Sequence, residues 1–238
     1  MRRKIYDRLV EWKRRSQGRT ALLIEGARRV GKSWIAEEFA RREYADYLLI
    51  DFSVADSSVR ELFVHDLSNL DVFFRKMFAM YSKVLRKRQS LVIFDEVQLF
   101  PRAREAIKHL VADGRFDYLE TGSLLSLKEN TQGILLPSEE ERITMFPMDF
   151  EEFLWSIGQG PLMDCIRDSF QALTPMGSGL HRRAMDVVRE YMVVGGMPQV
   201  VEKYLQNSDL GEADREKRMI LQLYQDDVAK HADRKSVV

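Results

Sequence analysis

The stretch Gly26-Ala27-Arg28-Arg29-Val30-Gly31-Lys32-Ser33 decides the fold of this chain. It follows the apolar run 21–24 and precedes Trp34-Ile35-Ala36-Glu37-Glu38-Phe39, so the order is strand, glycine-bounded loop, helix. The glycines let backbone N–H groups curl around phosphates, and the N-terminus of the following helix adds a positive dipole. The sequence therefore predicts a P-loop (Walker A motif) that binds a nucleoside triphosphate.

Two side chains of this loop have predicted chemical roles. Lys32 is expected to reach the β- and γ-phosphates, and the Ser33 hydroxyl is expected to bind Mg²⁺. Every residue of the stretch 26–33, together with Trp34, is predicted to contact the nucleotide. The rings of Trp34 and Trp12 are also expected to pack in the core. The simpler alternative is a glycine-rich turn with an exposed lysine.

Two acidic residues follow another buried strand. The apolar run 91–94 ends in Asp95-Glu96, which predicts carboxylates at the C-terminal edge of the sheet, as in a Walker B motif. Asp95 is expected to hold Mg²⁺ together with Ser33, and Glu96 to orient and deprotonate the attacking water. Such acids are common at strand ends, so an ordinary acidic turn is the alternative.

A pair of small hydroxyl residues follows another predicted strand, 116–120. In Thr121-Gly122-Ser123, a hydroxyl at the strand end can hydrogen-bond the γ-phosphate or the attacking water. Ser123 is the first candidate for this sensor role and Thr121 is the second. A Thr/Ser turn or helix cap would explain the same letters.

Periodicity divides the chain into an α/β part and a helical part. Helices are expected at 4–15 and 59–88. A capping box at Ser58 opens the second of these, and a break is expected near Ser68-Asn69. Further strands are expected at 47–52 and 142–146. A cap at Asp149 opens another helix, and after residue 160 only helical patterns occur, at 162–173, 181–194, 198–206 and 213–231. The predicted domains are an N-terminal helix (1–18), a P-loop core (19–157) and a smaller all-helical lid (158–238).

Composition excludes several classes of protein. Lys+Arg equals Asp+Glu at 37 each in 238 residues, so bulk charge predicts no polyanion binder. The lone Cys165 excludes an internal disulfide, and the scattered histidines give no zinc site. The sequence shows no secretory signal and no membrane span, which predicts a cytoplasmic protein.

With both phosphate-site motifs in place, the sequence resembles the AAA-like P-loop ATPases of bacteria and archaea that carry a C-terminal domain of unknown function. The resemblance implies ATP rather than GTP and a parallel sheet in the order 5-1-4-3-2, with Ser123 between Lys32 and Glu96. It covers nearly the whole chain and rests on Gly26 to Ser33, Ile93-Phe94-Asp95-Glu96-Val97-Gln98, Thr121-Gly122-Ser123, Phe146-Pro147-Met148-Asp149-Phe150-Glu151-Glu152-Phe153-Leu154, Tyr191-Met192-Val193-Val194-Gly195-Gly196-Met197-Pro198 and Tyr224-Gln225-Asp226-Asp227-Val228.

Two departures from the family pattern matter. Family members commonly continue well past a point equivalent to Val238, so this chain is expected to be a truncated or shortened form. The family often has a Gly-Arg pair after its Thr-Gly-Ser segment, whereas here Gly133 is followed by Ile134. An arginine that completes the γ-phosphate site is therefore unassigned, with Arg102, Arg104 and Arg142 as candidates.

Three functions are compatible with these motifs. The first is hydrolysis of ATP with Mg²⁺ as a conformational switch or small motor, with a homo-oligomer possible. The second is a small-molecule kinase in which Arg28 and Arg29 bind phosphate. The third is a nucleotide-dependent module that recognises DNA or a protein through basic clusters at 2–4, 13–15 and 86–88. Gly195-Gly196-Met197-Pro198 is expected to be a helix stop, with a hinge as the alternative.

Overall fold

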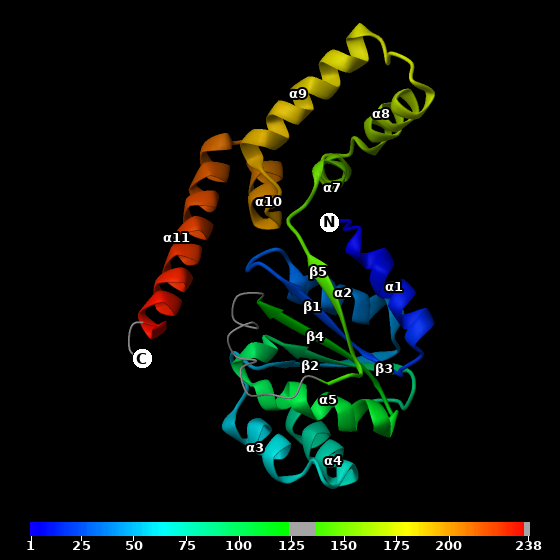
Figure 1. Cartoon of the computed structure of the whole chain (residues 1–238), viewed down its shortest axis with the longest axis vertical. Coiled ribbons are helices and arrows are strands. Elements are labelled where there is room, and N and C mark those ends of the chain that lie inside the picture. Colours follow the sequence, from blue (N-terminus) through cyan, green and yellow to red (C-terminus); the bar gives the residue numbers. More distant parts are fainter. Residues whose placement is uncertain (124–136, 236–238) are drawn as a thin grey trace. The chain divides into compact units, whose positions relative to one another are not determined.

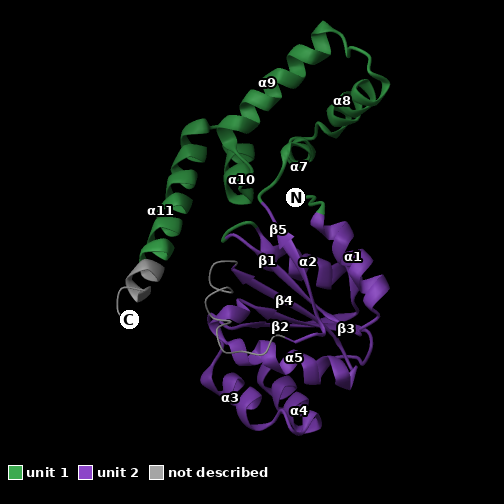
Figure 2. Cartoon of the chain, in the orientation of Figure 1, with its two compact units in different colours: residues 1–4, 28–30, 147–238 green, residues 5–27, 31–146 purple. Residues whose placement is uncertain are grey.

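The computed structural model describes residues 1–123 and 137–235, with backbone only for 230–235. The chain forms two compact units (Figure 2). The core unit comprises residues 5–27 and 31–146, and the helical unit comprises residues 1–4, 28–30 and 147–238. Gly133 and most of the stretch 128–140, predicted to be irregular, lie outside the described residues. The predicted domain limits 1–18, 19–157 and 158–238 stay a prediction.

The core unit is built on a five-stranded parallel sheet in the order β2-β3-β4-β1-β5. This is the predicted order 5-1-4-3-2 read from the other edge, so the expected fold class is confirmed. The strands β1 and β4 lie side by side in the middle, and their carboxyl ends share one edge of the sheet (Figure 1). The strands are β1 (Ala21–Gly26), β2 (Asp46–Asp51), β3 (Ser90–Asp95), β4 (Asp117–Ser123) and β5 (Glu140–Met145).

Helices cover both faces of this sheet, as a parallel sheet requires. On one face lies α2 (Lys32–Glu43), against which α1 (Ile5–Ser16) packs (Figure 1). On the other lie α3 (Ser57–His65), α4 (Leu70–Tyr81) and α5 (Pro101–Asp113), and the short 3₁₀ helix η1 (Val97–Leu99) precedes α5. Because side chains alternate along a strand, each strand supplies residues to both layers.

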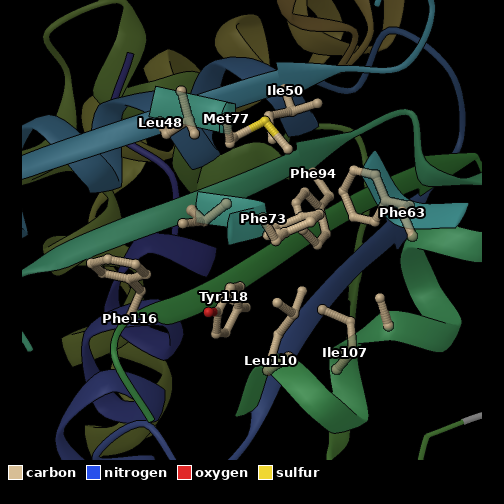
Figure 3. Close-up of a cluster of buried hydrophobic side chains, with 14 of the residues drawn as sticks. Leu48, Ile50, Phe63, Phe73, Met77, Phe94, Ile107, Leu110, Phe116 and Tyr118 are labelled. Carbon is tan, nitrogen blue, oxygen red and sulfur yellow. The ribbon is translucent and has the colours of Figure 1, made fainter. Parts of the chain in front are cut away.

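The layer under α3, α4 and α5 is rich in aromatic rings (Figure 3). Phe63 packs edge-on against Phe73 and Phe94, with ring centroids 5.0 and 5.6 Å apart. Edge-to-face pairs at this spacing add about 0.5–1.5 kcal/mol each beyond the apolar area they bury. This packing holds β3 in place, and β3 ends in the two candidate acids.

Two local predictions in the core unit are wrong. The helix expected to reach residue 88 ends at Tyr81, because Ser82 adopts a left-handed conformation with φ 50°. The cap before α3 is Asp56, which accepts from the Ser58 amide at 2.8 Å, rather than Ser58 itself. In addition, β4 continues to Ser123, so Thr121 and Ser123 are buried strand residues rather than a turn.

The helical unit contains the helices predicted for the C-terminal part of the chain. They are α7 (Phe150–Ser156), α8 (Gly160–Ala172), α9 (Ser178–Val194), α10 (Pro198–Asn207) and α11 (Leu210–Lys235). Asp149 and Glu152 form a complete capping box at the start of α7. None of the described helices combines the length and apolarity needed to cross a membrane.

Gly195 and Gly196 end α9 and let two backbone segments of the helical unit cross closely. The Met148 amide donates to the Gly196 carbonyl at 2.7 Å, and the Tyr191 hydroxyl donates to the Met148 carbonyl at 2.9 Å. A Cβ on Gly196 would overlap that Met148 carbonyl oxygen. The predicted helix stop and the proline-started helix after it are confirmed, and a hinge here stays a prediction.

Candidate nucleotide-binding site

The loop after β1 depends on glycine at two positions for different reasons. Gly26 is the last residue of β1 and pairs with Met145 of β5, and a Cβ there would overlap the Met145 carbonyl oxygen. Gly31 has φ 94°, a left-handed conformation that favours glycine, and precedes the first residue of α2. It has no side chain to cap α2, and a helix N-terminus of this kind is a typical binding site for an anion.

Lys32 begins α2 and is folded over the loop. Its side chain is 5% exposed, and Nζ donates to the carbonyl oxygens of Gly26 at 3.1 Å and Ala27 at 2.9 Å. Both carbonyls belong to the core unit, so the ammonium lies at the carboxyl end of β1. This is the position from which a P-loop lysine reaches phosphate oxygens.

Ser33 and Asp95, the two predicted Mg²⁺ ligands, are in direct contact. The Ser33 hydroxyl donates to Asp95 Oδ1 at 2.8 Å. The Thr121 hydroxyl donates to the same carboxylate oxygen. Phe94 pairs with Glu120 across β3 and β4, so the next residues along, Asp95 and Thr121, emerge together on the α2 face.

Glu96 is held in a specific orientation by Gln98. Its backbone is left-handed, with φ 53°, and its amide donates to Thr121 Oγ1 at 3.3 Å. Gln98 Nε2 donates to Glu96 Oε2, and Gln98 Oε1 accepts from the Ser123 amide at 3.3 Å. Gln98 is 3% exposed, and its contact with the Ser123 amide is buried, whereas its contact with Glu96 is half-buried. One amide side chain thus connects the candidate base to the end of β4.

The structure brings together Lys32, Ser33, Asp95 and Glu96 as predicted and changes the order of the hydroxyl candidates. Thr121, the second choice from sequence, contacts Asp95 and the Glu96 amide, whereas Ser123 pairs with Gly26 across β4 and β1. Gln98 was not among the predicted site residues. The sequence feature that could have indicated its role is a polar residue two positions after Glu96. Gln98 lies in the short helix η1, where it is buried.

The three residues at the tip of the loop belong to the helical unit and are engaged there. Arg28 Nη1 contacts Asp227 Oδ1 at 2.9 Å, and Arg29 Nη1 donates to Gln199 Oε1 at 2.9 Å. The carbonyl of Val30 accepts from Arg3 Nη1 at 2.9 Å. Their predicted contact with the nucleotide stays a prediction.

Trp34, which the sequence predicts to pack in the core, is not buried. It is 44% exposed, because the buried face of α2 is made by Ile35, Ala36, Phe39 and Ala40. Trp12, by contrast, is buried as expected. Contact between Trp34 and a nucleotide stays a prediction.

Two of the three arginine candidates for the γ-phosphate contact the buried carboxylate of Glu140. Arg104 is bidentate to Glu140 at 2.6 and 2.7 Å, and Arg142 Nε contacts Glu140 at 2.8 Å. Burial, followed by the charge of Glu140, raises the pKa of Glu120 well above its usual value. Burial also opposes the charge of Glu140, but Arg104 and then Arg142 outweigh it and lower the pKa of that carboxyl. Arg102 is exposed.

A family model described as an AAA domain matches residues 18–154. The chain belongs to this AAA domain family. The match covers β1 to β5 and all the candidate site residues of the core unit, so the resemblance inferred from the motifs is confirmed. A second model, described as a domain of unknown function (DUF8612), matches residues 185–238 of this AAA protein. That region includes α10 and α11.

Two solved structures are similar to this AAA protein at low identity. PCH-2 of C. elegans is 14% identical with a TM-score of 0.38, and the match covers 71% of this chain and 47% of that one. The Aeropyrum pernix ORC1 protein, solved in complex with DNA, is 12% identical with a TM-score of 0.45, and the match covers 89% of this chain and 64% of that one. The chain thus spans less than two thirds of either relative. No curated protein matches it.

Proposed function

We propose that this AAA protein binds ATP with Mg²⁺ and hydrolyses it as a conformational switch or small motor. The observation that carries the proposal is the 2.8 Å hydrogen bond from the Ser33 hydroxyl to Asp95. It joins Ser33, in the first turn of α2, to the acid at the end of β3, and these are the two groups that a P-loop NTPase uses to hold its metal.

The donor set at this position suits Mg²⁺. The Ser33 hydroxyl and the Asp95 carboxylate are hard oxygen ligands, and Mg²⁺ commonly takes only one or two protein ligands and completes its shell with phosphate and water oxygens. Among the described residues, no group of three or more His, Cys, Asp or Glu could hold a metal without such help. Bound there, Mg²⁺ would neutralise charge on the β- and γ-phosphate oxygens. Lys32 would bind the same phosphates.

The same edge of the sheet offers a base for the attacking water. In the proposed reaction Glu96 accepts a proton from water as the water oxygen bonds to the γ-phosphorus and the bond to the β-phosphate oxygen breaks. Gln98 fixes the direction of the Glu96 carboxylate, and Thr121 holds Asp95. Ser123 is proposed to sense the γ-phosphate from the end of β4.

The contacts of the arginines and lysines favour this proposal over the other two functions. A kinase would use Arg28 and Arg29 for phosphate, but both side chains are engaged within the helical unit. DNA recognition would use the basic clusters, yet many of their side chains already have partners inside their own unit. These pairs are Arg2 with Trp155, Lys4 with Asp149, Lys13 with Glu43, Arg15 with Glu141 and Arg86 with Asp46.

The test is phosphate release from ATP without any added acceptor, in the presence of Mg²⁺ or EDTA. Lys32→Ala should abolish ATP binding, whereas Glu96→Gln should bind ATP and stop turnover, because it removes the base and leaves the phosphate ligands in place. Lys108→Ala, an exposed lysine on α5, is the matched control and should behave as wild type. Equal ATP binding by wild type and Lys32→Ala would refute the assignment of the site.

A further inference from the structure

The carbonyl and side chain of Arg28 are both held by α11. The Tyr224 hydroxyl donates to the Arg28 carbonyl oxygen at 2.7 Å. One helical turn further along, Asp227 Oδ1 contacts Arg28 Nη1 at 2.9 Å. Asp227 is 16% exposed and Arg28 is 40% exposed, so this ion pair is partly shielded. Arg28, Tyr224 and Asp227 all belong to the helical unit.

The next two residues of the loop are held in the same way. Arg29 has φ 64°, a conformation that costs energy for a residue with a side chain, and its guanidinium donates to Gln199 on α10 at 2.9 Å. The Val30 carbonyl accepts from Arg3 in a buried hydrogen bond of 2.9 Å. Three consecutive loop residues therefore have partners outside the loop.

These contacts fix the direction of the loop amides. In a trans peptide the C=O of one residue and the N–H of the next point in opposite directions. Tyr224 holds the carbonyl of Arg28, and Arg3 holds the carbonyl of Val30. The amides of Arg29 and Gly31 consequently point away from these two donors. N–H groups are what a P-loop presents to phosphate, so the contacts pre-orient them before any ligand binds.

We propose that α10 and α11 set the nucleotide affinity of this protein by holding the tip of the P-loop through Gln199, Tyr224 and Asp227. These three are positioning residues, and they give a role to the region that matches the domain of unknown function. The inference rests on the proposed function, because it assumes that the loop binds a nucleotide. Coupling of this kind is reciprocal, so a bound nucleotide must also hold α11 more firmly.

The experiment compares the wild-type chain of 238 residues with Tyr224→Phe, Asp227→Asn and the double variant by titration with MgADP. Loss of one ordinary hydrogen bond should weaken ADP binding about fivefold for Tyr224→Phe. Loss of a partly exposed ion pair should weaken it by about two- to fivefold for Asp227→Asn. Asp226→Asn is the matched control. Asp226 is exposed and is the neighbour of Asp227, so this variant removes the same charge and should leave the affinity unchanged.

Hydrogen exchange supplies a second measurement, and its nucleotide-free part does not depend on nucleotide binding. Without nucleotide, the amides of residues 28–31 should exchange faster in Tyr224→Phe than in wild type and Asp226→Asn. With MgADP, exchange along α11 should slow in wild type and slow less in the double variant. Unchanged ADP affinity in the double variant, or unchanged exchange at 28–31, would overturn the inference. A wild-type protein that binds no ADP or ATP would instead refute the proposed function.

Discussion

Replacing Gln98 with alanine tests whether the amide between Glu96 and Ser123 is required for turnover. Gln98 donates to the Glu96 carboxylate and accepts from the Ser123 amide, and it is 3% exposed. Without Gln98, the Glu96 carboxylate is still present but loses the hydrogen bond that orients it. The expected phenotype is therefore slow hydrolysis rather than loss of nucleotide.

The magnitude follows from the kind of hydrogen bond that is removed. A hydrogen bond to a charged group contributes about 1.5–3 kcal/mol. If that free energy is needed to align the base in the transition state, kcat falls about 10- to 100-fold, since each 1.4 kcal/mol is about a tenfold change in rate. Nucleotide affinity should stay within about twofold, because the interaction is made at the base and not at the phosphate ligands.

Steady-state phosphate release and MgADP titration measure the two quantities separately. Gln98→Glu is a second variant of the same shape, which keeps an acceptor for the Ser123 amide but faces Glu96 with another carboxylate, and its kcat should fall as well. Gln89→Ala changes an exposed glutamine and serves as the control. Wild-type kcat in Gln98→Ala, with an unchanged unfolding temperature, would refute the role of Gln98.

Two further predictions concern stability. Burial and then Glu140 raise the pKa of Glu120, so the folded protein keeps a proton there that the unfolded chain loses above about pH 4.3. Its contribution to the free energy of unfolding therefore falls as pH rises between those pKa values, with a limiting slope of about 1.4 kcal/mol per pH unit. Glu120→Gln should flatten that slope and be more stable than wild type at pH 7. Urea unfolding at pH 5 and pH 8 measures the free energy of unfolding of both proteins. An equal change in that free energy between the two pH values in the variant and in wild type would contradict the prediction. Gly196→Ala should lower the free energy of unfolding by about 1–3 kcal/mol, because the new methyl group meets the Met148 carbonyl. Gly179→Ala on α9, where a Cβ meets nothing within 4 Å, should lose no stability, and a similar loss in both variants would rule out the overlap as the cause.

The P-loop and the acids after β3 could be predicted because their chemistry is local in sequence. A glycine-bounded loop between a strand and a helix, or acids directly after an apolar run, can be recognised from adjacent letters. Parallel strands bring their carboxyl ends to one edge, so contact between Ser33 and Asp95 followed from the fold class. The family resemblance supplied the strand order that placed β4 between β1 and β3.

The end of α4 at Tyr81, rather than at residue 88, depends on contacts between residues far apart in the sequence. Helical periodicity continued past Tyr81, but Ser82 turns left-handed and the basic side chains that follow bond elsewhere in the core unit. Lys83 donates to the Tyr47 carbonyl, and Arg88 donates to the carbonyls of Gly114 and Gln17. These partners are distant in sequence, so no local pattern could reveal them.

By itself the sequence determined the P-loop, the acids, the order of helices and strands, and membership of the AAA family. Tertiary structure alone decided that Thr121 rather than Ser123 contacts Asp95, because that depends on the register of β4 against β3. It also decided that Gln98 orients Glu96 and that Tyr224 and Asp227 hold Arg28. Hydrogen bonds between residues far apart in the chain depend on distances and directions that exist only after folding.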